Sequence, residues 1–132
     1  MALVYTSCGK CYNESESFEG FDLAVVDNLG NSILGLNTRY NIDDVHFMID
    51  DIDLIYGYYK SNEIYYFLID YSGLQPGTYS GQLQLHENEN IPIELNLSWD
   101  DDTCFPHNDI DQLAIEGEYY EVNEDYKVHI IK

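Results

Sequence analysis

Apolar and polar residues alternate with period two along most of this chain, and tyrosine, isoleucine, leucine and valine supply the apolar positions. This alternation is typical of half-buried β-strands, whose side chains point to opposite faces of a sheet in turn. Short runs rich in Gly, Asn, Asp and Glu separate the alternating segments and predict turns. The pattern therefore predicts four hairpins, which pair residues 21–27 with 32–36, 54–60 with 64–71, 78–86 with 91–99, and 118–122 with 126–131.

Two segments have helical spacing instead. Residues 43–52 carry apolar side chains at i, i+3, i+4 and i+7, namely Val45, Met48, Ile49 and Ile52. Asn41 provides an N-cap for this helix. Residues 109–116, which lie between a potential cap and a glycine, predict a second short helix. We therefore expect an all-β fold, an antiparallel β-sandwich formed by one domain over residues 1–132, with one or two short helices.

Residues 74–81 read Leu-Gln-Pro-Gly-Thr-Tyr-Ser-Gly and lie between two expected strands. Together with the strand that follows, up to residue 99, this segment resembles the Pro-Gly-Thr-Tyr corner of immunoglobulin-like bacterial sandwich domains, namely fibronectin type III and BACON-like modules. The resemblance implies an immunoglobulin-like sandwich, in which Tyr79 donates a hydrogen bond back across the corner and Pro92 lies in the last strand of the motif. It implies nothing about function, because many unrelated functions share this fold.

The chain carries 25 acidic residues against five basic ones, a formal charge of −20. A field of this sign attracts cationic partners and repels nucleic acid and anionic membranes. With 14% aromatic and 45% hydrophobic residues, the chain is nonetheless typical of a folded protein and not of an acidic disordered tail. No apolar run approaches the ~20 residues of a membrane helix, and the first residues lack the features of a signal peptide. We expect a cytoplasmic protein with reduced thiols.

All three cysteines lie in pairs of potential metal ligands with a two-residue spacer, Cys8-Gly9-Lys10-Cys11 and Cys104-Phe105-Pro106-His107. Two ligands at this spacing reach one tetrahedral ion, and Cys8, Cys11, Cys104 and His107 together form a Cys3His set of the kind found in structural zinc sites. The sequence therefore predicts a structural zinc that fixes the N-terminal segment to the loop before the last hairpin. A redox pair, a disulfide and ordinary buried cysteines are the alternatives.

Motifs of common enzyme active sites are missing from the sequence, namely a glycine-rich phosphate loop, a Gly-x-Ser-x-Gly elbow and a His-Glu-x-x-His helix. Carboxylates are so numerous that the presence of two of them does not indicate a glycosidase. Residues 100–102, with Asp109 and Asp111, lack the spacing of an EF-hand loop, so a solvated acidic surface is favoured over a loose calcium site. We expect a non-enzymatic protein without catalytic residues.

A small, acidic, aromatic-rich β domain without chemistry of its own resembles, in general character and not in any motif, the bacterial immunity proteins that neutralise nuclease toxins. We therefore expect an inhibitor that binds a basic protein, a nuclease toxin in the first instance, and blocks its cationic active site. The alternatives are a phage nucleic-acid mimic that inhibits a restriction or CRISPR nuclease, and an acidic structural or adhesive β module. A mimic spaces carboxylates like phosphates along one face, whereas an immunity protein needs only a patch matched to one toxin.

Two acidic clusters and one exposed tyrosine are the expected partner-binding residues. The first cluster consists of Asp43, Asp44, Asp50, Asp51 and Asp53, and the second of Asp100, Asp101, Asp102, Asp109 and Asp111. Tyr119 and Tyr120 are consecutive, so in a strand one of them points away from the core and is available to a partner. For any single Asp, a solvated surface position is the simpler interpretation.

Overall fold

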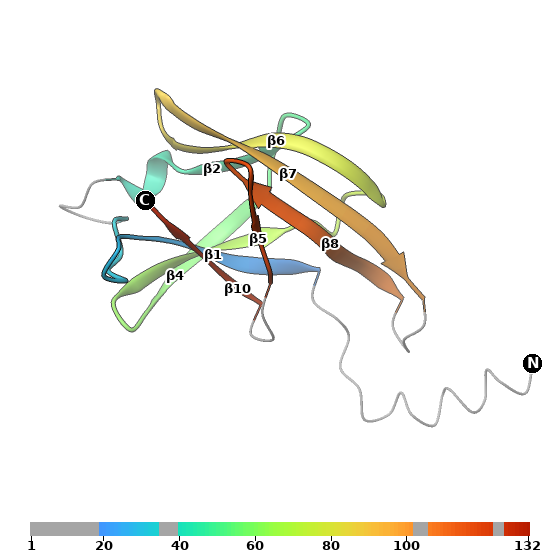
Figure 1. Cartoon of the computed structure of the whole chain (residues 1–132), viewed down its shortest axis with the longest axis horizontal. Helices are drawn as coiled ribbons and strands as arrows, with labels where there is room; N and C mark the ends of the chain where they lie inside the picture. Colours follow the sequence, from blue (N-terminus) through green and yellow to red (C-terminus); the bar gives the residue numbers. More distant parts are fainter. Residues whose placement is uncertain (1–18, 35–39, 102–105, 123–125) are drawn as a thin grey trace, which may run out of the picture.

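The computed structural model describes residues 19–34, 40–101, 106–122 and 126–132. Within these residues the chain forms two β-sheets that face each other (Figure 1). One sheet has the strand order β10–β1–β5–β4 and contains β1 (Gly20–Val26), β4 (Ile55–Ser61), β5 (Ile64–Asp70) and β10 (Lys127–Ile131). The other has the order β3–β2–β6–β7–β8–β9 and contains β2 (His46–Ile49), β3 (Ile52–Asp53), β6 (Gly77–His86), β7 (Glu89–Asp100), β8 (His107–Ile115) and β9 (Glu118–Tyr120). The prediction of an all-β sandwich is confirmed.

Neighbouring strands are antiparallel in every pair except β1 and β10, which run parallel. The helical content of the described residues is one short 3₁₀-helix, η1 (Ile42–Asp44), which the side chain of Asn41 caps by accepting a hydrogen bond from the Asp43 N–H. Among these residues, no helix has the length and apolar character needed to cross a membrane.

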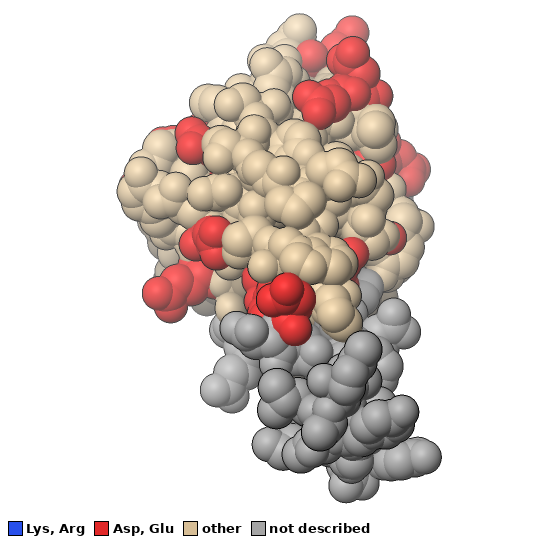
Figure 2. Space-filling view, turned by 90° about the vertical axis from the view of Figure 1, so that its right-hand side faces the viewer, with Lys and Arg blue, Asp and Glu red and all other residues tan. Residues whose placement is uncertain are grey.

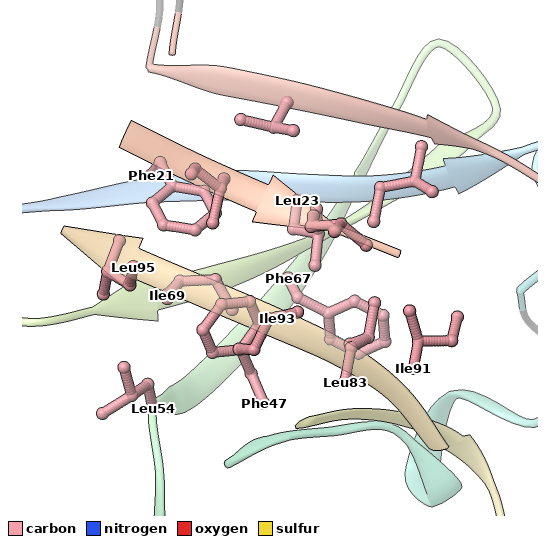
Figure 3. Close-up of a cluster of buried hydrophobic side chains, with 14 of the residues drawn as sticks. Phe21, Leu23, Phe47, Leu54, Phe67, Ile69, Leu83, Ile91, Ile93 and Leu95 are labelled. Carbon is pink, nitrogen blue, oxygen red and sulfur yellow. The ribbon is translucent and has the colours of Figure 1, made fainter. Parts of the chain in front are cut away.

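The inner faces of both sheets contribute to one core, part of which is shown in Figure 3. Phe21 of β1 and Phe47 of β2 meet edge to face across the sandwich, with 5.9 Å between their ring centroids. Other fully buried residues are Leu23, Phe67, Ile69, Leu83, Leu95 and Leu113. Each such side chain stabilises the fold by about 1.5–3 kcal/mol relative to an exposed one, which is why the alternating segments form strands with one buried face.

Two of the expected hairpins are present as predicted. Strands β4 and β5 are joined by Asn62 and Glu63, which both have positive φ, as a two-residue hairpin turn requires. Strands β6 and β7 form the longest ladder of the larger sheet, from the pair Gly77 and Leu97 to the turn at residues 87–88. At the corner before β6, the Tyr79 hydroxyl donates to the Gln75 carbonyl at 2.7 Å. This is the hydrogen bond that the corner motif implies, while the immunoglobulin-like relationship itself stays a prediction.

The first expected hairpin is described only in part. After β1, Val26 makes an isolated antiparallel bridge with Ser32. The turn between them is held by the carboxylate of Asp27, which accepts hydrogen bonds from the backbone N–H groups of Leu29 and Asn31, each at 2.9 Å. The rest of the expected partner strand extends into residues 35–39, outside the described residues.

Both predicted α-helices are wrong. In residues 43–52 only η1 is helical, and the chain then forms β2 and β3, joined by a turn in which Asp50 and Asp51 have φ of +51° and +65°. The residues of β2 also fit period two, since Phe47 and Ile49 are fully buried while His46 and Met48 are only partly buried. Pairing with β6 favours the strand over the helix. Residues 109–116 likewise fall mainly in β8, which pairs with β7 along its length.

The fourth expected hairpin is also wrong in its pairing. Both strands exist as β9 and β10, but they belong to different sheets: β9 pairs with β8, and β10 pairs with β1. The expected helix stop at Gly117 is instead part of the turn between β8 and β9, where Glu116 and Gly117 have φ of +54° and +81°. A two-residue turn of this kind makes β9 pair with β8, and β10 is then the edge strand of the smaller sheet.

Candidate partner-binding surface

The two acidic clusters lie on the larger sheet but are not adjacent. In the first cluster, Asp43 and Asp44 are in η1, Asp50 and Asp51 form the β2–β3 turn, and Asp53 is in β3. In the second, Asp100 ends β7, Asp101 follows it, and Asp109 and Asp111 are in β8, while Asp102 lies outside the described residues. Strands β6 and β7 separate β2 from β8, so the clusters do not form one continuous row of carboxylates.

Several of these carboxylates have structural roles. Asp53 accepts hydrogen bonds from the backbone N–H groups of Phe47 and Ile55, at 3.1 and 3.0 Å, and its other oxygen lies 2.8 Å from His46 Nδ1. These contacts hold the chain where it passes from β3 to β4. Asp111 accepts from the Ser98 hydroxyl across the β7–β8 ladder, at 2.8 Å. Local hydrogen bonds therefore account for both carboxylates without a partner, and their role in binding stays a prediction.

Asp50 and Asp51 occupy a more accessible position. They line an open hollow of about 570 Å³ with Met48, Ser80, Gly81 and Gln82. The hollow follows from the β2–β3 turn, which projects beyond the point where Ile49 pairs with Gly81.

A group of three potential metal ligands connects β7 with β8. Asp100 and His107 are ladder partners, and the ligand atoms of Asp100, His107 and Asp109 all lie within 4.8 Å of one another. His107 is 8% exposed, and its Nε2 lies 2.9 Å from a carboxylate oxygen of Asp109. The other three predicted zinc ligands, Cys8, Cys11 and Cys104, lie outside the described residues.

The two consecutive tyrosines divide as expected between the faces of β9. Tyr119 is 72% exposed, whereas Tyr120 packs against the core. Tyr119 lies opposite Ala114, and Tyr120 lies opposite the fully buried Leu113. Tyr119 is therefore the one that faces solvent.

Another concavity lies outside the residues that the sequence predicted as partner-binding. We call it the Trp99 hollow; it has a volume of about 330 Å³ and is lined by Glu19, Ser72, Leu74, Gln75, Pro76, Trp99 and Asn108. Trp99 is 54% exposed even though it continues the inward phase of Leu95 and Leu97. The reason is that β6 begins opposite Leu97, so Trp99 extends beyond the last β6–β7 pair.

Asn108 organises the floor of the Trp99 hollow. It is 4% exposed and is the ladder partner of Trp99. Its backbone N–H donates to Glu19 Oε1 at 2.6 Å, its carbonyl accepts from the Tyr71 hydroxyl at 3.3 Å, and its side-chain Nδ2 donates to the Leu74 carbonyl at 2.9 Å. Its Oδ1 is buried and has no hydrogen-bond partner among the described residues. A buried acceptor without a partner costs about 1–3 kcal/mol, so a donor that reaches it would be strongly favoured.

A further hollow adjoins the Trp99 hollow at the loop of residues 71–76. This Tyr56 hollow has a volume of about 320 Å³ and is lined by Ile52, Asp53, Leu54, Tyr56, Asp70, Ser72, Gly73 and Leu74. Ser72 and Leu74 line both hollows, which are therefore neighbours. Ile52, Tyr56 and Trp99 are among the exposed large hydrophobic residues of the described chain. Exposed aromatic side chains beside hollows are typical of residues that carry interface energy.

The charge around both hollows is negative. The lysines among the described residues line neither of them: Lys60 and Lys132 pair with Glu63 and Glu116, both at 3.2 Å, and Lys127 lies over the ring of Tyr66. Figure 2 shows the side of the molecule on which β7 ends and β8 begins in Figure 1. Asp and Glu form separate groups there around a surface of other residues, and no described Lys or Arg is visible.

Three carboxylates also converge on the buried Tyr71. Burial raises the pKa of its hydroxyl well above the ordinary value of 10, and the nearby charges of Asp109, Glu19 and Asp70 raise this pKa further. These carboxylates belong to β8, to the chain before β1, and to the Tyr56 hollow. The negative field therefore spans the end of the sandwich that carries both hollows.

No protein-family model, no curated protein and no solved structure matches this chain. The geometry of the two hollows and the charge that surrounds them are therefore the features that bear on function.

Three tyrosines with raised pKa values predict a loss of stability in alkali. Burial raises the pKa of Tyr59, whose hydroxyl donates to Asp22, and burial also raises that of Tyr120 and Tyr71. Because the unfolded chain titrates near pH 10, it loses these protons before the folded chain does. The free energy of unfolding should therefore be fully present below about pH 10 and fall as the pH rises toward the folded pKa values.

Urea unfolding between about pH 8 and 12 measures this loss. Tyr59→Phe should make it shallower, and Tyr119→Phe, which removes an exposed phenol, is the matched control. If the loss of unfolding free energy is complete before pH 9, it does not come from these tyrosines.

Proposed function

We propose that this protein is a non-enzymatic inhibitor that binds a cationic protein, and that the partner is a nuclease toxin whose active site it blocks, in the manner of an immunity protein. The observation that carries the proposal is the end of the sandwich at which the Trp99 and Tyr56 hollows adjoin. Exposed aromatic residues stand there beside carboxylates, and none of the described lysines lines either hollow. A nuclease active site is cationic because it holds phosphates, so it is complementary in charge to such a surface.

The distribution of the acidic residues favours this function over a nucleic-acid mimic. A mimic needs carboxylates at regular phosphate-like intervals along one face. In this chain strand β6 separates the strands that carry the two acidic clusters, and Asp53 and Asp111 are engaged in local hydrogen bonds. A patch matched to one partner needs no such regularity.

The decisive experiment measures inhibition as well as binding. The protein should inhibit one member of a panel of purified basic nuclease toxins at stoichiometric concentration, and should not bind duplex DNA at about 0.15 M salt, because its field repels phosphates. A basic protein of similar net charge without nuclease activity serves as the control. Equal binding to every basic protein without inhibition would support the adhesive or structural module instead. Measurable binding to duplex DNA would remove the electrostatic basis of the proposal.

The structural zinc also belongs to this proposal, as a device that holds the N-terminal segment in a reducing cytoplasm. This zinc site is proposed because of the two-residue spacing within the ligand pairs, Cys8 with Cys11 and Cys104 with His107. Protein purified without chelator should contain one zinc per chain, and chelation should lower the melting temperature, because metal binding contributes free energy to folding. His107→Ala should lose the metal, whereas His86→Ala, which changes an exposed histidine of β6, should keep it. Metal-free protein with an unchanged melting temperature after chelation would contradict the site.

A further inference from the structure

We propose that the Trp99 hollow is a binding site for the guanidinium group of an arginine side chain. The inference rests on the proposed function in one respect only, namely that the protein carrying this arginine is the inhibited protein. The recognition chemistry itself follows from the lining of the hollow.

One of the lining residues, Asn108, carries a buried acceptor. Asn108 is 4% exposed, and its Nδ2 is fixed by the Leu74 carbonyl, which sets the orientation of the amide. Oδ1 is left without a partner among the described residues. A ligand group that pairs with this covered oxygen must displace the atoms above it and must be a hydrogen-bond donor, since a carbonyl oxygen only accepts.

A carboxylate, that of Glu19, lines the hollow beside Asn108. Glu19 uses Oε1 to accept from the Asn108 N–H at 2.6 Å, which leaves its second oxygen for a ligand. A carboxylate and an amide oxygen at one site require several donors together with positive charge. Guanidinium supplies five N–H donors in a rigid plane and stays protonated, whereas an ammonium group supplies three donors from one point.

An aromatic side chain forms part of the wall of the hollow. Trp99 is 54% exposed and lines the same hollow as Glu19 and Asn108. Arginine stacks on aromatic faces, and tryptophan is the most favourable of them for a cation. The volume of about 330 Å³ lies at the lower end of the range for ligand pockets, which suits one side chain better than a cofactor.

Acetyl-arginine-amide is the probe, and acetyl-citrulline-amide, which has nearly the same shape without the charge, is its control. Trp99 is the only tryptophan of the chain, so its fluorescence reports on this hollow alone. The arginine probe should change this signal with a dissociation constant in the millimolar range, and the citrulline probe should bind at least tenfold more weakly. Acetyl-lysine-amide should also bind more weakly than the arginine probe.

Two variants test the assigned contacts. Glu19→Gln keeps the acceptor for the Asn108 N–H and removes the charge, and Asn108→Leu removes the buried Oδ1; each should weaken probe binding at least fivefold. Asn96→Leu, which changes a half-buried amide on β7, is the matched control for Asn108 and should bind as the original chain does. Unfolding curves identify any variant that fails to fold, and Glu19→Gln keeps the test decisive if Asn108→Leu is such a variant.

Three results would overturn the inference: no change in Trp99 fluorescence, equal binding of the arginine and citrulline probes, or equal binding of the arginine and lysine probes. None of these depends on a protein partner. If the probe fails while a nuclease is still inhibited, the hollow is wrongly assigned and the proposed function stands. If the probe binds and no nuclease is inhibited, the site stands and the partner is another arginine-bearing protein.

Discussion

Replacing Gly81 with alanine is expected to destabilise the fold by about 3 kcal/mol, the upper part of the usual range for overpacking. Gly81 lies in β6 opposite Ile49 of β2. A Cβ at this position would lie 2.0 Å from the Met48 carbonyl oxygen and 2.7 Å from Cδ1 of Ile49. The first of these atoms belongs to the backbone, so a rotamer change cannot relieve the contact and β2 itself must move.

The control for this substitution is Gly73→Ala. A Cβ at Gly73 would have no heavy atom within 4 Å, so this variant should unfold at nearly the same denaturant concentration as the original chain. Equilibrium unfolding in urea measures both. Equal stability of the two alanine variants would mean that β2 does not lie against β6 at this distance, and the register of the larger sheet would have to be revised.

Those parts of the fold that depend on local signals were predictable from sequence. The β4–β5 and β6–β7 hairpins combine period-two alternation with short polar turns, and both signals lie within a few residues of each other. The turn residues Asn62 and Glu63 then take the positive φ that such hairpins require.

The errors arose where one set of residues fits two patterns. Ile49 and Ile52 satisfy helical spacing in residues 43–52, but Phe47 and Ile49 also satisfy alternation, and the neighbouring β6 is available to pair with them. Tertiary pairing decided the outcome, as it often does against local propensity. The parallel pairing of β10 with β1 joins the last strand to the first and has no local signal at all.

The candidate site was predicted in its charge but not in its geometry. Composition alone indicated an acidic surface and a cationic partner. Trp99 follows Leu95 and Leu97 in phase, so alternation alone does not distinguish it from a core residue, and only the starting point of β6 shows that β7 continues beyond the core. Asn108 was expected to cap a helix and instead lies buried beside Trp99, a position that depends on the β7–β8 register.

The proposed inhibitor should associate with its nuclease at a rate that falls by about 100-fold between roughly 0.02 and 0.5 M salt, while the dissociation rate changes by about threefold or less. The reason is that salt screens long-range attraction between the −20 chain and a cationic active site, whereas contacts inside the formed interface exclude the ions. Stopped-flow mixing measures the first rate, and dilution of the complex measures the second.

Two sets of substitutions locate this electrostatic attraction. Changing Asp100, Asp101 and Asp102 to asparagine removes three consecutive charges of the second cluster and should slow association about tenfold, with the fold unchanged or slightly stabilised because self-repulsion decreases. Changing Asp43, Asp44 and Asp50 to asparagine removes the same net charge from the first cluster, so any difference between the two variants reports position and not total charge. Equal rates for both would mean that the field acts as a whole and that the second cluster has no special place in the encounter.

The exposed aromatic residues should determine the dissociation rate. Trp99→Ala should raise the dissociation rate about 30-fold or more, which corresponds to the roughly 2 kcal/mol of an interface hot spot, and should leave association nearly unchanged. Tyr119→Ala tests the exposed tyrosine of β9, which lies on the outermost strand beyond β8. If Tyr119→Ala raises the dissociation rate and Trp99→Ala does not, the partner binds the edge of the larger sheet and not the end that carries the hollows. A partner whose association ignores salt altogether would show that the acidic surface has another purpose, because a charge of −20 next to a cationic active site must act at long range.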